Sequence, residues 1–515
     1  MLDFSVMLKK FLKNIALVLF LNLLIKPFWI LGIDRSVQNF VGVADYGFYY
    51  SIFSFSFLLN ILLDFGITNF NNKNIAQNNH LLRKHLSSII VLKLILGTIY
   101  FVISIICAFI IRYNSLQILL LIVLAFNQFL ISFVLYLRSN LSGLHLFKID
   151  SFISVLDRTI MIIVCAFLLW GMPSTFEFTI RTYAFAQTFA YFMTAVITLI
   201  IVFRKAKSKF LKLKWNFPFS LMIIKNSFPF AVLVLLMTFY NRIDTVMMER
   251  MLPDASALKD NLYSGEVQCG IYASAYRLLD ATNMIAFLFA GLLLPLFAKM
   301  IKHKESVESL VKLAFSLLFA GAIIVSLCSF FYSREIMEML YPRNIHLRPN
   351  EIIESVSQYN QRIFESSKVF GYLMGCFIPI STTYVFGTLL TANGNLKQLN
   401  IMAASGMAIN IILNLFLIPR FYAVGSAFAS FTTQFTTSLV QIIIAQKIFR
   451  FNINVRFLIS LIIFVIGVIG AGYISKQFEY RWTTSLIIMI LISGTLAIIL
   501  RIVNFRDMLK IIKND

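Results

Sequence analysis

Ten charged side chains lie inside long apolar runs of the 515-residue chain, where few water molecules can solvate them. The six cations and four acids are Lys26, Lys93, Arg158, Lys225, Arg242, Arg277, Asp64, Asp157, Asp244 and Asp280. A charge at the centre of a membrane-spanning helix costs roughly 2.5–3.5 kcal/mol on the insertion scale. Such residues normally face a bundle interior or a water-filled cavity, and they mark the path of a substrate or an ion. The excess of cations predicts an anionic passenger.

Three of these cations, Lys26, Arg242 and Arg277, are expected to line that cavity. Lys26 precedes Pro27, which should kink its helix and free backbone carbonyl groups. Arg242 and Asp244 are two residues apart, so they point to different sides of one helix and cannot simply neutralise each other. By contrast, Lys93 and Lys225 lie within about two turns of a span end and are expected to reach the interface.

Polar residues also follow one helical face in two of the spans. Arg277, Asp280 and Asn283 have the three-residue spacing of one face, and Ser54, Asn60 and Asp64 are expected to form a corresponding face on an earlier span. Two polar faces of this kind would suit a hydrated cavity. An ion pair between Arg277 and Asp280 within their helix remains an alternative, and Asp64 is an alternative brace for a loop. Asp244 and Asp280 are candidates for coupling to H⁺ or Na⁺.

The elements that hold these residues are predicted from composition to be membrane-spanning helices. Apolar residues make up 59% of the chain and charged residues 13%, with a mean hydropathy of +0.83, too little charge to coat an aqueous globule. A span needs about 20 apolar residues. The fourteen expected spans are approximately 14–33, 46–68, 88–111, 116–137, 152–171, 179–203, 219–247, 270–297, 310–333, 367–392, 396–418, 422–446, 457–474 and 483–500.

The net charge of +22 fits this arrangement as a topology signal. With the N-terminus inside, the inner segments carry about 26 cations and about 6 acids, as the positive-inside rule requires. The basic run 204–214 is therefore interpreted as a cytoplasmic linker near anionic lipid, and no nucleic-acid partner is expected. The cysteines lack C-x-x-C spacing and no His lies at ligand spacing from them, so no metal site is expected.

The linker divides the chain into two similar halves of six spans. An Ile-Asp pair ends the first span of each half, at Ile33–Asp34 and at Ile243–Asp244, and a Gly-x-Tyr opens the next helix. We expect an N-terminal lobe over 1–215, a C-terminal lobe over 216–452 and two extra spans with a tail over 453–515. Six spans preserve orientation, so the lobes should be related by a pseudo-two-fold axis along the membrane normal.

Several ordered motifs resemble a known family. Gly-Ile-Tyr-Ala-Ser-Ala-Tyr-Arg-Leu at 270–278, Asn410-x-x-x-Asn414 with Ile418-Pro419, and Leu-Asp-Phe-Gly at 63–66 are similar to the polysaccharide flippases. These Wzx-type oligosaccharide exporters belong to the multidrug/oligosaccharidyl-lipid/polysaccharide exporter superfamily. The resemblance implies two six-helix lobes around a central cavity, alternating access, and a lipid-linked pyrophosphate bound by basic residues on the first, seventh and eighth spans.

The expected function is therefore export of an undecaprenyl-pyrophosphate-linked oligosaccharide for surface polysaccharide such as O-antigen or lipopolysaccharide, without enzymatic activity. The protein should lie in a bacterial cytoplasmic membrane with both termini in the cytoplasm. Membrane lipids and other glycan-assembly membrane proteins are candidate partners, and no cofactor is expected beyond an H⁺ or Na⁺ coupling ion. No phosphate-binding G-x-x-x-x-G-K-[ST] loop is present for direct use of ATP.

Three other functions remain open. A multidrug exporter of the same superfamily, coupled to H⁺ or Na⁺, would need acids to dominate its cavity for a cationic drug, whereas cations dominate here. A membrane glycan polymerase or ligase would be expected to use a large outer loop, for which 334–366 is the candidate. A structural scaffold would not need buried cations.

Overall fold

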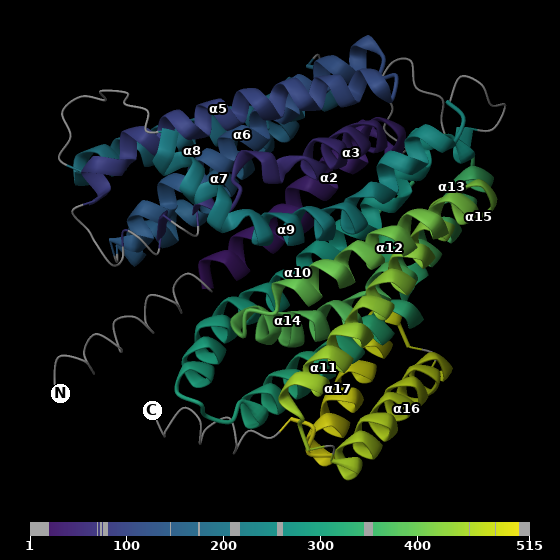
Figure 1. Ribbon diagram of the computed structural model, residues 1–515. Coiled ribbons are helices and arrows are strands. Elements are labelled where there is room, and N and C mark those ends of the chain that lie inside the picture. Colours follow the sequence, from purple (N-terminus) through teal and green to yellow (C-terminus); the bar gives the residue numbers. More distant parts are fainter. Residues whose placement is uncertain are drawn as a thin grey trace. The chain divides into compact units, whose positions relative to one another are not determined.

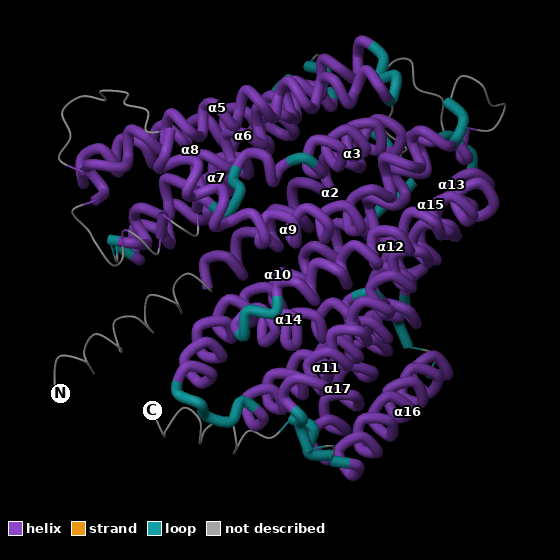
Figure 2. The backbone as a smooth tube through the Cα atoms, viewed as in Figure 1, coloured by secondary structure: helices purple, strands orange, loops and turns teal. Residues whose placement is uncertain are grey.

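The computed structural model consists of helices throughout the residues that it describes, and Figure 2 shows no strand among them. The described residues are 20–68, 71–72, 75, 81–144, 146–173, 176–206, 217–254, 261–343, 354–452, 454–478 and 480–503. The start of the expected first span and most of the basic linker lie outside these ranges. The predicted all-α polytopic membrane fold is confirmed.

The chain forms two compact units, Met1–Arg250 and Met251–Asp515. The helices of the first unit are a helix over 20–28, η1 (Trp29–Asp34), α2 (Arg35–Val41), α3 (Val43–Leu58), η2 (Asn60–Leu63), α5 (Leu81–Ile110), α6 (Ser115–Gly143), α7 (Phe147–Ala166), η3 (Phe167–Gly171), α8 (Ile180–Ala206) and α9 (Phe217–Met251). Helix α6 packs against α3, α5, α7 and α8 and so forms the centre of this unit. Its start is fixed by a capping box, in which Asn114 and Gln117 satisfy each other's backbone N–H groups.

The second unit is also wholly helical in its described part. Its helices are η5 (Asn261–Tyr263), α10 (Gly265–Lys302), α11 (Glu308–Phe331), α12 (Ser333–Leu340), α13 (Val356–Gly375), α14 (Phe377–Ala392), α15 (Leu396–Phe449), α16 (Val455–Gln477) and α17 (Trp482–Ile499). Helix α10 packs against α13, α14 and α15, and α11 packs against α13 and α14. The expected last two spans are α16 and α17, which lie side by side at the yellow end of the chain and pack on α11 (Figure 1).

Eleven helical segments in the described part of the chain are long and apolar enough to cross a membrane. One of them, α15, is 54 residues long and contains a non-helical residue, Tyr422, so it holds two of the expected spans. The first expected span is only partly described. The second is short, because α3 ends at Leu58 and a 3₁₀ turn follows. These features are compatible with fourteen spans. The expected division at 215 and 452 stays a prediction, since the compact units divide at Arg250.

Candidate functional site

The helix that carries Lys26 changes its geometry just after Pro27. The α-helix over 20–28 gives way to the π-helix Trp29–Asp34, which agrees with the expectation that Pro27 disrupts regular hydrogen bonding here. Such π-helical turns are frequent at functional sites. Lys26 is partly buried on this helix.

A hydrogen bond aligns this helix with α7 one turn before the charged residues. Asn22 donates its side-chain N–H to Ser154 Oγ at 3.0 Å, and both residues are buried. Lys26 and Arg158 each follow four residues later, so each lies on the same helical face as its bonded neighbour. This register places Lys26 and Arg158 one turn beyond the same contact between the two helices.

Three cations of the first unit form what we call the first-unit cation cluster: Lys26, Arg138 and Arg158. The charge of Arg138, on α6, acts on Lys26. Arg138 Nε donates to Asp150 Oδ1 at 2.7 Å, and Arg158 Nε lies 3.6 Å from Asp157 Oδ2. Each of the two arginines is thus paired with an acid, and no ion pair of Lys26 is formed with a residue that the structure describes.

The Arg158 guanidinium is also held by aromatic rings. Its carbon lies 5.8 Å from the ring centroid of Trp29 and 5.6 Å from that of Tyr191, distances at which cation–π attraction acts. The sequence placed Arg158 among the charged span residues but not among the expected site residues. Its ion pair with the adjacent Asp157 is formed although neighbours on a helix point in different directions.

Arg242 has a different set of neighbours from Lys26. Its Nη1 donates to Tyr50 Oη at 2.7 Å, and its guanidinium carbon lies 5.4 Å from the Phe57 ring centroid, so it packs against α3. Arg242 is half-buried, whereas Asp244 is only 1% exposed. This difference fits the prediction that the two side chains point to different sides of α9.

Arg277 belongs to the second unit, where α10 continues unbroken past it. Its Nη1 lies 3.9 Å from Asp280 Oδ2, so the ion pair within the helix that the sequence left open is formed. One turn on, Asn283 Oδ1 is buried with no hydrogen-bond partner among the described residues. Lys26 and Arg242 lie in the first unit and Arg277 in the second; their convergence on one cavity stays a prediction.

The polar face expected on the second span is interrupted. Ser54 lies on α3 with its Oγ buried and no hydrogen-bond partner in the described part of the chain. Asn60 lies in the 3₁₀ turn η2 and donates to Gln128 Oε1 at 2.8 Å, and Asp64 follows that turn. Because the α-helix ends at Leu58, these residues do not share one helical face, and the prediction that they do is wrong.

Asp64 holds the segment that follows α3 in place. This agrees with the second of the two roles considered for it, a brace for a loop, whereas the first was a residue of the polar cavity face. Asp64 accepts hydrogen bonds from the backbone N–H and the Oγ1 of Thr68, at 3.3 and 2.6 Å, and it pairs with Lys93. The expectation that Lys93 reaches the interface is wrong, because the Lys93 side chain is 1% exposed. Its Nζ instead donates to Asp64, to the Leu63 carbonyl and to Ser132 Oγ.

Asp34 is a buried carboxylate that the sequence did not mark as a site residue. It is 0% exposed and accepts hydrogen bonds from Tyr46 Oη at 2.9 Å, Tyr183 Oη at 2.5 Å and Gln38 Nε2 at 3.3 Å. Tyr183 also stacks on Trp29, with ring centroids 6.2 Å apart, which connects Asp34 to the first-unit cation cluster. The repeated Ile-Asp pair was the available signal, since Asp244 of the second pair is buried as well.

The described residues contain no group of three or more His, Cys, Asp and Glu side chains that could hold a metal ion. The five cysteines are free thiols. What the site offers is charge and hydrogen bonding: cations stacked on aromatic rings in one unit, and a paired Arg277 in the other.

The helical fold of this multi-pass membrane protein has counterparts among solved structures. The fold is similar to that of the lipid II flippase MurJ in an inward closed conformation, with a TM-score of 0.68 and 13% identity over 96% of this chain and 99% of that one. An inward-facing multidrug resistance MATE family transporter of the MOP superfamily gives 0.56 and 14% identity, over 85% of this chain and 98% of that one. The Vibrio cholerae MATE transporter VcmN gives 0.51 and 13% over the same shares.

Residues 11–301 match the family described as polysaccharide biosynthesis protein, and the chain belongs to that family. The family resemblance read from the sequence motifs is thereby confirmed. No curated protein sequence matches the chain.

Proposed function

We propose that this protein moves an undecaprenyl-pyrophosphate-linked oligosaccharide from the inner to the outer leaflet of a bacterial cytoplasmic membrane, for surface polysaccharide biosynthesis. Membership of the polysaccharide biosynthesis family and a fold like that of a lipid II flippase support a lipid-linked substrate. Both termini lie in the cytoplasm in this proposal, and the two halves alternate access to the two sides.

The observation that carries the proposal is the first-unit cation cluster. A pyrophosphate diester bears about two negative charges, and desolvating them in hydrocarbon is the barrier to crossing. Arginine offers paired donors to phosphate oxygens, and lysine offers a mobile point charge. Lys26 and Arg158 each lie one helical turn after the Asn22–Ser154 hydrogen bond that joins their two helices, so together they can replace part of the water shell of a phosphate.

Arg242 and Arg277 are proposed to bind the same headgroup at a later or earlier stage of transport. With a cell interior that is negative, outward movement of each negative charge is favoured by about 2.3 kcal/mol per 100 mV. Asp244 and Asp280 are proposed either to restrain the cations in the empty carrier or to take up the H⁺ or Na⁺ that resets it. The sugar crosses in the polar interior while the lipid tail stays in the bilayer.

The test is complementation of a flippase-deficient strain, with surface glycan as the readout. Arg242→Ala combined with Arg277→Ala should abolish most export at normal membrane levels of the protein, and Lys26→Ala should lower it. Lys225→Gln is the matched control, because this exposed cation of α9 precedes the candidate span at Phe228–Met251. Normal export by the double variant would exclude these arginines as substrate ligands.

The hydrogen bond from Arg242 to Tyr50 allows a structural role of this arginine to be separated from substrate binding. Tyr50→Phe removes the acceptor and keeps the guanidinium. If Arg242 binds substrate, Tyr50→Phe should retain most of the export that Arg242→Ala loses. Equal loss in both variants would mean that Arg242 mainly holds α9 against α3. Resistance to cationic drugs should not change in any variant; its loss would favour a multidrug exporter.

A further inference from the structure

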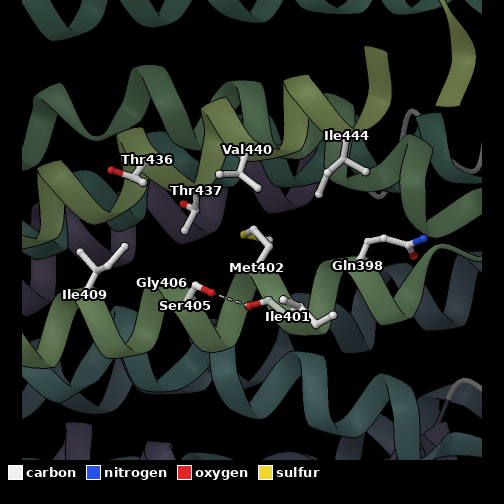
Figure 3. A pocket seen from close by; sticks show the side chains of 10 residues that line it. All are labelled: Gln398, Ile401, Met402, Ser405, Gly406, Ile409, Thr436, Thr437, Val440 and Ile444. Atoms are coloured by element: carbon white, nitrogen blue, oxygen red, sulfur yellow. Dashed lines mark hydrogen bonds between the residues drawn. The ribbon is translucent and has the colours of Figure 1, made fainter. Parts of the chain in front are cut away.

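Helix α15 is a hairpin of two limbs that turn at Tyr422. Tyr422 has φ 53° and ψ −135°, which breaks the helix. Three residues later, a Cβ on Gly425 would lie 2.5 Å from the backbone oxygen of Leu417, so only glycine allows the limbs to approach here. Further along, Gln398 lies opposite Ile444 and Ile409 lies opposite Thr436, as Figure 3 shows. The limbs therefore run antiparallel.

A groove of about 270 Å³ lies between these limbs. Its lining comes from both of them: Gln398, Ile401, Met402, Ser405, Gly406, Ile409, Thr436, Thr437, Val440 and Ile444. The hydroxyls in this lining donate to carbonyl groups of their own limb, Ser405 to Ile401 at 3.0 Å, and Thr436 and Thr437 to the carbonyls four residues earlier at 2.8 and 2.9 Å. With these donors already used, the groove offers a mostly apolar surface.

The groove lies within a candidate membrane-spanning segment. Both limbs belong to a segment long and apolar enough to cross a bilayer. In its lining the apolar side chain of Ile401 is 59% exposed. In a spanning protein such a side chain contacts lipid tails, so a hydrocarbon chain is the ligand that matches this groove.

One end of the groove carries exposed cations. Lys397 is four residues before Ile401, and Lys447 is three residues after Ile444, so each lies on the same helical face as a lining residue. Arg450 ends the second limb nearby in the sequence and is also exposed. The sequence has no Asp or Glu from 366 to 478. No ion pair of these three cations is formed with any residue that the structure describes.

We propose that this groove binds one acyl chain of an anionic phospholipid of the surrounding bilayer, with the phosphate headgroup at Lys397 and Lys447. The positive-inside pattern predicts that this end faces the cytoplasm, where basic pockets between spans bind acidic headgroups. The cations are exposed, which suits a resident lipid that exchanges with the bilayer. This site is independent of the proposed transport function.

The test is native mass spectrometry of the full-length protein in detergent with equimolar dioleoyl phosphatidylglycerol and dioleoyl phosphatidylcholine. The two lipids have the same chains, so their ratio reports the headgroup. The wild type should retain phosphatidylglycerol preferentially. Lys397→Gln combined with Lys447→Gln should reduce that preference by roughly 30-fold, the effect of two basic residues near an acidic headgroup. Arg420→Gln is the matched control, an exposed cation near the turn.

The groove itself is tested by filling it. Val440→Trp should prevent retention of both lipids, because the indole occupies the space of the acyl chain, while Ile443→Trp on the exposed side of the same limb should retain them. Equal retention of both lipids by the wild type would overturn the proposal. So would an unchanged preference in the double lysine variant, or displacement of phosphatidylglycerol by an equal amount of undecaprenyl phosphate, which would assign the groove to the transported lipid.

Discussion

Lys93 Nζ lies 2.5 Å from Asp64 Oδ1, yet the two side chains differ in exposure, at 1% and 25%. Nζ also donates to the Leu63 carbonyl at 2.9 Å and to Ser132 Oγ at 3.1 Å. All three N–H groups of the ammonium therefore have acceptors. Lys93, on α5, thereby connects the segment after α3, which contains Leu63 and Asp64, to Ser132 on α6.

This asymmetry predicts unequal effects of removing either partner. Asp64→Ala leaves a buried ammonium without its counter-ion and should lower stability by about 3–5 kcal/mol. Lys93→Met leaves a carboxylate that water can reach, so its cost should be smaller. Thermal melting of the purified variants in detergent measures the order. A larger loss for Lys93→Met would contradict the assignment of Lys93 as the buried partner, and Lys93→Met with Asp64→Asn should recover part of the loss.

The hydrogen bonds to Asp34 should contribute strongly to the first unit. The carboxylate is 0% exposed and accepts from Tyr183 Oη and Tyr46 Oη. Tyr183→Phe should lower stability by about 1.5–3 kcal/mol, the usual contribution of a hydrogen bond to a charged group. The control is Tyr473→Phe, since Tyr473 is 66% exposed. Equal melting temperatures for Tyr183→Phe and the wild type would show that the bond contributes little.

The sequence predicted the helical spans well because long apolar runs leave few alternatives in a membrane. It also singled out Asp34 and Asp244 as a repeated pair, and both are buried. It could not predict that α3 stops at Leu58, because no proline or glycine stands there and the apolar pattern continues. It could not identify the partners of Lys93 or the two rings that hold Arg158, since Leu63, Ser132, Trp29 and Tyr191 are all distant from these residues in the chain.

A steric prediction concerns the turn of α15. Gly425→Ala would place a methyl group 2.5 Å from the backbone oxygen of Leu417, and backbone atoms cannot move aside as a flexible side chain can. The expected loss of stability is about 1–3 kcal/mol. Gly470→Ala on α16 is the matched control, because nothing lies within 4 Å of the added methyl. Alanine there should stabilise the helix by about 0.5–1 kcal/mol. If both variants behave alike in thermal melting, the close approach at Gly425 is not limiting.

The stacking of Arg158 on Trp29 and Tyr191 predicts that shape matters as well as charge. Arg158→Lys keeps the positive charge but loses the planar group that lies over both rings. Cation–π contacts contribute about 0.5–2 kcal/mol, so binding of undecaprenyl pyrophosphate to the purified protein should weaken by about 2-fold to 30-fold. Arg158→Gln removes the charge too and should weaken binding further. Arg204→Lys, at the exposed end of α8, is the control. Identical affinities for Arg158→Gln and wild type would place the bound phosphate away from this cluster, and the transport proposal would then depend on Arg242 and Arg277.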